Sequence, residues 1–412
     1  MSRHARPGPA RARFILAGAG LILGLAVVTV VALLPAATTA ARSGAAPSSA
    51  VTPTRSTRPS RVSRPSSPPS SRPAAPAALT SWLLPPGPQP GHLAPGSQPS
   101  ALPGPILIVD KFNNRLIVVD PQGRIRWQFP RPGDLAPGQT FLIPDDAFFT
   151  PDGREIVATQ EDQQLVTVID IATHRIVYRY GTPGVSGAQP NQLSNPDDAM
   201  MLPDGYLLSP DIKNCRLLLL SPSSHVPVRV IGTTTTNCYH APPQRWGSPN
   251  GAFPMSGGNY LITEINGDWV NSLDLHTGAV AWSTHPPGVN YPSDTNQVGT
   301  SDRYLTVDYS SPGQAVIFDH NGNLIWRYRP GGNAGLDHPS LALPLPNGDV
   351  LITDDYNHRV LVVDPHTDQV LWQYGVRGVP GAGPGYLNNP DGLDLLPPFS
   401  LLGTHKSSMG RP

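Results

Sequence analysis

From residue 105 onward the chain alternates short apolar runs with turns rich in Gly, Pro, Asn and Asp. The runs, such as residues 359–364 and 369–374, are rich in β-branched and aromatic side chains, which is typical of antiparallel strands. The turns PDG (203–205) and PNG (346–348) carry glycine where a hairpin needs a positive φ. Apolar positions do not recur every 3.6 residues in this region, so we predict an all-β fold with almost no helix.

The strand pattern restarts six times, and each copy opens with a proline followed by a small or acidic polar residue. The openings are Pro144-Asp145, Pro196-Asp197, Pro249-Asn250, Pro292-Ser293, Pro339-Ser340 and Pro390-Asp391. Their spacing of roughly 43 to 53 residues is the period of one four-stranded propeller blade. We predict five complete blades, at residues 144–181, 195–232, 248–285, 291–329 and 338–375. A β-sandwich with fortuitous spacing is the alternative.

The sixth copy is divided between the two ends of the repeat region. Residues 389–398 supply only a first strand, whereas residues 105–129 supply the second, third and fourth strands with no first strand before them. Joining the two pieces closes a ring and removes the unpaired sheet edges that an open array would expose. The sequence therefore predicts a six-bladed β-propeller over residues 105–398.

Two motifs resemble those of known repeat families. Three blades share the spacing D-x-x-N-x-R, which resembles NHL repeats: Asp110/Asn113/Arg115, Asp211/Asn214/Arg216 and Asp354/Asn357/Arg359. The segment LDLHTGAVAW (273–282) resembles the tryptophan-docking motif of quinoprotein-like (PQQ-like) repeats, with weaker echoes ending in Trp127, Trp326 and Trp372. The resemblance implies a propeller in which these residues act structurally. Redox quinoproteins generally have more blades and often a pair of adjacent cysteines, so we expect no bound quinone.

The first hundred residues have a different composition. Basic residues 1–13 precede an uncharged apolar run at 14–34, which is long enough to span a bilayer. We expect a single-pass signal anchor with the propeller outside the cytoplasm, or a secreted protein if cleavage occurs within residues 36–41. Residues 35–104, rich in Pro, Ser and Ala, are expected to be a disordered linker, and residues 399–412 a flexible tail. The abundance of Arg, Ala, Gly and Pro over lysine suggests a bacterial gene.

Charge is distributed unevenly along the chain. The sequence has 29 basic and 29 acidic residues, but ten arginines and no acidic residue precede Asp110. The ring is therefore acidic, which argues against binding nucleic acid because that binding depends on neutralising phosphates. The basic linker either lies against anionic wall polymer or lipid, or simply keeps itself soluble.

The two cysteines lie in one predicted blade. Cys215 begins its third strand, and Cys238 follows the end of its fourth strand by a few residues. Both positions fall on the face where first strands start, here called the top face. A disulfide between them is consistent with export, and two free thiols are the alternative.

The top face is also where we predict a functional site, because the longer loops between blades lie there. The openings place polar side chains at the mouth of the central channel: Asp145, Asp146, Asp197, Asp198, Asn250, Asp294 and Asp391. Converging carboxylates favour Ca²⁺ or Mg²⁺ over zinc, and Asp145, Asp197 and Asp391 are the predicted ligands. The alternative is that each residue caps its own turn.

The leading functional hypothesis is a monomeric, membrane-tethered scaffold or binding module for a protein or cell-wall ligand, because the sequence holds no catalytic signature. The alternative is an enzyme. Residues 338–355 and 362–374 resemble repeats of arylsulfotransferase-type propellers, which would imply His338 as nucleophile and His240 or His285 as its partner. A metal-dependent lactonase or lyase using the channel carboxylates is the third hypothesis.

Overall fold

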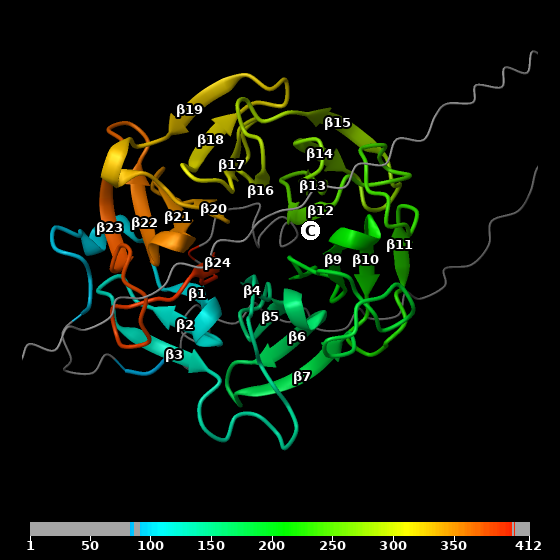
Figure 1. Ribbon diagram of the computed structural model, residues 1–412, viewed down its shortest axis with the longest axis horizontal. Helices are drawn as coiled ribbons and strands as arrows, with labels where there is room; N and C mark the ends of the chain where they lie inside the picture. The colour runs from blue at the N-terminus through cyan, green and yellow to red at the C-terminus, as the bar shows by residue number, and fades with distance from the viewer. Residues whose placement is uncertain (1–82, 86–90, 398, 400–412) are drawn as a thin grey trace, which may run out of the picture. The chain divides into compact units, whose positions relative to one another are not determined.

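A computed structural model describes residues 83–85, 91–397 and 399 of the chain. In these residues the strands form six separate four-stranded antiparallel sheets arranged around a central channel (Figure 1). Each predicted unit contains one sheet, so the predicted six-bladed propeller is confirmed. The described residues contain no helix with the length and apolar character of a membrane span. The predicted anchor at 14–34 lies outside them.

The blades are numbered I to VI, with the strands of each given from the channel outward. Blade I is β24 (Pro390–Leu395), β1 (Ile106–Asp110), β2 (Arg115–Val119) and β3 (Ile125–Phe129). Blade II is β4 (Ala147–Phe149), β5 (Glu155–Gln160), β6 (Leu165–Asp170) and β7 (Arg175–Tyr180). Blade III is β8 (Met200–Met201), β9 (Leu207–Asp211), β10 (Arg216–Leu220) and β11 (Arg229–Ile231). Blade IV is β12 (Pro249–Pro254), β13 (Tyr260–Glu264), β14 (Trp269–Leu273) and β15 (Val280–Thr284). Blade V is β16 (Pro292–Gln297), β17 (Tyr304–Asp308), β18 (Gln314–Phe318) and β19 (Leu324–Tyr328). Blade VI is β20 (Ala342–Pro344), β21 (Val350–Asp354), β22 (Arg359–Asp364) and β23 (Gln369–Gly375).

Helical structure in the described residues is confined to short 3-10 turns. Four of them follow the second strand of a blade: η2 (Lys111–Asn113), η3 (Glu161–Gln163), η4 (Ile212–Asn214) and η6 (Asp355–Asn357). The other two are η1 (Pro99–Ala101) and η5 (Gly332–Ala334). The four turns after second strands all lie on the top face, because an innermost strand starts where its antiparallel neighbour ends.

Blade I closes the ring as predicted. β24 pairs antiparallel with β1, with Ile106 opposite Leu395 and Ile108 opposite Leu393. Every residue of β24 and of β1 is buried. The last and the first strands of the propeller therefore share one sheet, which removes two open edges.

The hydrophobic core lies between neighbouring blades rather than inside any one sheet. Val118 and Trp127 of blade I pack in one cluster with Ile156 and Ile169 of blade II. The Trp127 Nε1 donates to the carbonyl oxygen of Ile171 at 3.1 Å, so the indole spans the gap between the two blades. This is the structural role that the repeat resemblance implies for these tryptophans.

The D-x-x-N-x-R residues join the second and third strands of their blades. In blade I the Asp110 Oδ2 accepts hydrogen bonds from Asn113 Nδ2 at 2.8 Å and from Arg115 Nε at 2.7 Å. The corresponding Arg216–Asp211 and Arg359–Asp354 distances are 2.8 and 2.7 Å. All three aspartates are fully buried, so each ion pair is shielded from solvent.

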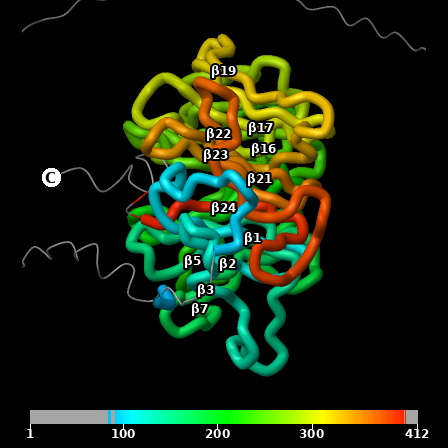
Figure 2. Tube along the Cα trace, turned by 90° about the vertical axis from the view of Figure 1, so that its left-hand side faces the viewer, coloured from blue at the N-terminus to red at the C-terminus, as the bar shows by residue number. Residues whose placement is uncertain are grey.

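The structure corrects the start of the folded unit. Residues 91–104, which the composition assigned to the linker, lie along the outer edge of blade VI (Figure 2). The backbone N–H of Ala94 donates to Gln373 at 3.1 Å, and that of Gln98 donates to Leu371 at 2.7 Å. This segment pairs because β23 is an outermost strand with unpaired backbone groups. The predicted remainder of the linker, except residues 83–85, lies outside the described residues, as does the tail beyond residue 399.

One disulfide joins Cys215 to Cys238, whose Cα atoms are 5.1 Å apart. Cys215 has a φ of 56° and ends the η4 turn, at the top of blade III. Cys238 belongs to the long loop 233–247 that leads to blade IV. The disulfide therefore fastens this loop to the top face.

Candidate functional site

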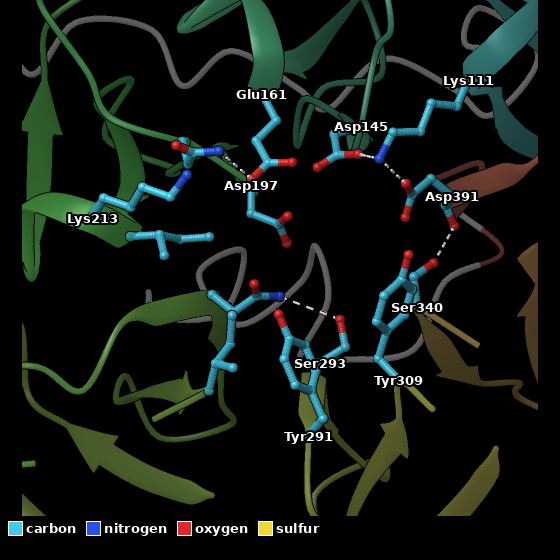
Figure 3. Close-up of a pocket in the computed structure, with 14 residues that line it drawn as sticks. Lys111, Asp145, Glu161, Asp197, Lys213, Tyr291, Ser293, Tyr309, Ser340 and Asp391 are labelled. Carbon is cyan, nitrogen blue, oxygen red and sulfur yellow. Dashed lines mark hydrogen bonds and ion pairs between the residues drawn. The ribbon is translucent and has the colours of Figure 1, made fainter. Parts of the chain in front are cut away.

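A cavity of about 280 Å³ opens at the mouth of the channel (Figure 3). Five blades contribute lining residues from two places, near the start of the innermost strand and in the turn after the second strand, and blade VI contributes only the first. They are Lys111, Asp145, Glu161, Asn195, Asp197, Ile212, Lys213, Asn250, Ile265, Tyr291, Ser293, Tyr309, Ser340 and Asp391. The sequence predicts a functional site on this face, at the starts of the innermost strands.

The opening motifs form two levels of the channel wall. The second residue of every opening lines the cavity: Asp145, Asp197, Asn250, Ser293, Ser340 and Asp391. The third residue of each opening is buried behind this lining, and in three blades it is acidic: Asp146, Asp198 and Asp294. Four of the seven predicted channel residues therefore face the cavity, and the other three lie behind them.

A further ring of lining residues was not predicted. Each of its members directly follows the acidic or amide residue that ends a second strand: Lys111, Glu161, Ile212, Ile265 and Tyr309. The sixth equivalent, Asp355, is fully buried and accepts a hydrogen bond from the Ser340 hydroxyl at 3.2 Å. In three repeats the second strand ends at the Asp of the D-x-x-N-x-R motif. Aligning all six repeats on the last residue of the second strand would have found this ring.

Lys111 neutralises one side of the cavity. Its ammonium group forms ion pairs with Asp145 and with Asp391, which lies 280 residues away in the sequence. Burial opposes the charge on Lys111, but the two carboxylates outweigh it and hold the lysine pKa well above its usual value. Burial and then Asp145 raise the pKa of Asp391 to about 7, although Lys111 acts in the opposite direction.

Two carboxylates, Glu161 and Asp197, lie on the other side of the cavity from the Lys111 ammonium group, where Lys213 also lines the wall (Figure 3). Carboxylate oxygens of Asp145, Glu161 and Asp197 all lie within 4.8 Å of one another, and these side chains converge in Figure 3. Glu161 accepts a hydrogen bond from Asn195 Nδ2 at 2.8 Å. Within the described residues neither Glu161 nor Asp197 forms an ion pair. Burial and then the charges of Asp145 and Asp146 raise the pKa of Asp197 well above its usual range.

The three carboxylates behind the lining are more buried still. Asp146 and Asp198 are 2 % exposed and Asp294 is fully buried. Two glycines make room for them: a Cβ on Gly392 would lie 2.3 Å from Asp146 Oδ1, and one on Gly251 would lie 2.4 Å from Asp294 Oδ1. Burial is the first cause that raises the pKa of each carboxyl well above its usual range, and neighbouring carboxylates add to it.

These carboxylates do not cap their own turns. Side chains such as Asp120, Asp274 and Asp364 accept hydrogen bonds from the backbone N–H two residues later. Among the described residues, no channel carboxylate accepts such a bond; the Asp198 Oδ2 instead accepts from the Ala252 N–H of the next blade at 3.2 Å. The turn-capping alternative therefore fails for this ring.

The three predicted histidines lie outside the cavity lining. His240 and His285 cover the two faces of the Trp269 indole, with ring centroids 4.1 and 3.6 Å from it. His338 lies elsewhere, against Tyr309 and Tyr356, at centroid distances of 5.0 and 4.6 Å. The structure thus brings His240 and His285 together around Trp269 but gives His338 a different set of neighbours.

Asp294→Asn is expected to stabilise the protein, and to do so more at pH 8 than at pH 5. The raised pKa of Asp294 keeps its proton in the folded state while the unfolded chain has released it, so wild-type stability falls as pH rises from about 4 through the folded pKa. The asparagine carries no charge at any pH. Thermal unfolding of both proteins from pH 5 to 8 measures this difference.

The difference between the two proteins is the informative quantity. His174, His240 and His358 have lowered pKa values because they are buried, and they contribute stability that increases with pH in both proteins. Asp162→Asn, which removes an exposed charge, is the control and should leave the profile unchanged. An Asp294→Asn profile parallel to that of the wild type would contradict the prediction.

One repeat family and several solved structures are similar to this chain. Residues 244–388, which include blades IV to VI, match a PQQ-like repeat family described as outer membrane protein assembly factor BamB. No curated protein matches the sequence.

A structure of a protein of unknown function from Bacteroides caccae matches with 14 % identity and a TM-score of 0.48, covering 71 % of this chain and 98 % of that one. Virginiamycin B lyase from Staphylococcus aureus matches with 12 % identity and a TM-score of 0.40, covering 56 % and 69 %. Kuenenia stuttgartiensis hydrazine synthase matches with 14 % identity and a TM-score of 0.44, covering 69 % and 78 %. The six four-stranded blades identify the chain as a six-bladed β-propeller, and residues 244–388 of that propeller are similar to PQQ-like repeats.

Proposed function

We propose that this protein is an extracytoplasmic binding propeller that receives a positively charged group at the top mouth of its channel. One observation carries the proposal: Asp145, Glu161 and Asp197 converge in the cavity wall, and Lys111 neutralises only one of the three. Grouped carboxylates repel one another unless protons or a cation offset their charge. A bound cation is therefore the ligand class that this wall favours.

The shape and the surroundings of the cavity support a binding role. The phenol rings of Tyr291 and Tyr309 lie on the opposite side of the cavity from Glu161 and Asp197 (Figure 3). The long loops 182–194, 233–247 and 376–388 lead into or out of blades on the same face, and the disulfide fastens one of them. A larger protein or cell-wall ligand can rest on these loops while its charged group, or an ion that it shares, enters the mouth.

In this proposal the apolar run at residues 14–34 tethers the propeller to the outside of the cell membrane. The histidine-based alternative gains no support from the side-chain contacts. In the part of the chain that the structure describes, neither His240 nor His285 contacts His338, so the nucleophile and its partner are not assembled.

A panel of ligands is expected to separate cations from anions. Ca²⁺, Mg²⁺, spermidine and citrate are added to the full-length chain in detergent, and the melting temperature is measured at pH 7.5. At least one cation should raise the Tm, because binding at one hundred times Kd stabilises the folded state by about 2.7 kcal/mol. Citrate should not. Asp197→Asn should remove most of the shift, whereas the exposed Asp162→Asn should preserve it. Equal shifts in wild type and Asp197→Asn would contradict the proposal.

A further inference from the structure

We propose that the cation at the channel mouth is a divalent metal ion of the calcium type, coordinated by Asp145, Glu161 and Asp197. This inference rests on the proposed function and specifies its ligand. The three carboxylates come from neighbouring places in the ring: Asp145 opens blade II, Glu161 lies on the η3 turn of the same blade, and Asp197 opens blade III.

The separation of the oxygens fits a shared ion. Calcium binds oxygen at about 2.3–2.6 Å, so two ligands of one ion are at most about 5 Å apart. The oxygens of Asp145, Glu161 and Asp197 all lie within 4.8 Å of one another, which is inside this limit. The ligand set contains only oxygen, which favours calcium or magnesium over zinc.

A second observation points to the same place. Asp146, Asp197 and Asp198 form another group whose oxygens lie within 4.8 Å of one another, and it shares Asp197 with the first. Asp146 is 2 % exposed, and within the described residues its Oδ1 has no hydrogen-bond partner, whereas the Asp198 carboxyl group shares a hydrogen bond with Asp294. A buried carboxylate oxygen without a partner is costly, and a nearby cation offsets that cost.

Lys111 decides which carboxylates are available to the metal. The predicted ligand set was Asp145, Asp197 and Asp391, but Asp391 is held by the lysine ammonium group on the other side of the cavity. Asp145 also contacts Lys111, through Oδ1, which leaves its Oδ2 for the ion. Glu161 therefore replaces Asp391 as the third ligand. The cavity of about 280 Å³ leaves room for water or a ligand oxygen to complete the coordination.

The test measures metal binding directly. Full-length protein is treated with EDTA, dialysed and titrated with CaCl₂ alone by calorimetry at pH 7.5. Terbium luminescence excited through tyrosine provides a second readout, because Tyr291 lines the same cavity. We expect one Ca²⁺ per chain, displacement of Tb³⁺ by Ca²⁺, and affinity at least tenfold lower in both Glu161→Gln and Asp197→Asn. Asp162→Asn, an exposed change on the same turn as Glu161, should bind like wild type.

The outcomes separate this inference from the proposed function. Absence of Ca²⁺ and Mg²⁺ binding, together with spermidine binding that depends on Asp197, would overturn the metal site and leave the cation-binding function standing. Absence of binding by all three cations would overturn both. Calcium binding that is unchanged in Glu161→Gln and Asp197→Asn would place the ion elsewhere and also overturn the site. Circular dichroism of each variant confirms that it is folded before its affinity is compared.

Discussion

A chain ending at Asn388 is expected to lose the cooperative unfolding transition of the propeller. This deletion removes β24, every residue of which is buried, and exposes the edge of β1. It also removes the buried Leu393, Leu395 and Leu396. Losing a buried leucine side chain costs about 2–5 kcal/mol, so the three together approach the whole stability of a typical domain, about 5–15 kcal/mol. Far-UV circular dichroism and thermal unfolding measure the effect.

Shortening the other end provides the matched control. A chain beginning at Gly91 retains every strand of blade I and the segment that pairs with β23. Among the described contacts it loses those of residues 83–85, including the backbone hydrogen bond from Leu84 to Arg126. It should melt close to the full-length protein. A chain ending at Asn388 that unfolds cooperatively within a few degrees of the full-length protein would show that closure by β24 is dispensable.

Arg359→Ala is expected to lower the free energy of unfolding by about 3–5 kcal/mol, the usual cost of leaving one partner of a buried ion pair unpaired. The Arg359 Nε donates to Asp354 Oδ2 at 2.7 Å, and Asp354 is fully buried. Burial already raises the pKa of Asp354, and Arg359 is the largest of the influences that oppose it. Urea denaturation at pH 7 measures the loss.

An exposed pair gives the comparison for this substitution. The Arg154 and Asp152 side chains are 76 % and 60 % exposed and 3.8 Å apart, so Arg154→Ala should cost less than about 1 kcal/mol. If Arg359→Ala cost no more than Arg154→Ala, the D-x-x-N-x-R motif would not be the structural tie between strands that the geometry indicates.

Blade IV shows how the ring tolerates loss of this motif. Glu264 and Trp269 occupy the paired positions that hold Asp354 and Arg359 in blade VI. In place of an arginine, the Glu264 carboxylate accepts hydrogen bonds from the Gly247 N–H and from Asn271 Nδ2, and the His240 Nδ1 lies 3.2 Å from it. Burial raises the pKa of Glu264 to about 7, although the hydrogen bonds from Gly247 and Asn271 lower it. Hydrogen bonds replace the missing cation there.

The blades could be predicted because each one is a local property of the chain. Strand length, turn glycines and the recurring Pro-polar opening all lie within about fifty residues, and hairpins pair strands that are adjacent in sequence. Even the closure of blade I followed from counting strands, since residues 389–398 lack the second, third and fourth strands that residues 105–129 supply. The N-terminal boundary was wrong because residues 91–104 pair through backbone groups, and composition does not report backbone pairing.

The candidate site was predicted only in part. The openings placed Asp145, Asp197 and Asp391 at one face, because every innermost strand starts there. Which carboxylate is neutralised depended on Lys111, whose contact with Asp391 spans 280 residues. Glu161 was missed because a single strand-ending turn does not show which way its side chain points; only a comparison of the equivalent position in all six repeats groups Glu161 with Lys111 and Tyr309.

The sequence by itself determined the repeat, the number of blades, the closing strand and the face that carries the polar mouth. These features depend on local strand pairing and on the alternation of apolar and turn residues, which are written within each repeat. Only the tertiary structure decided which side chains share the cavity, which carboxylates remain without a counter-ion, and that His338 lies apart from His240 and His285. Such distances depend on the closed ring, because it brings residues of different blades to one axis, and no short stretch of sequence contains that geometry.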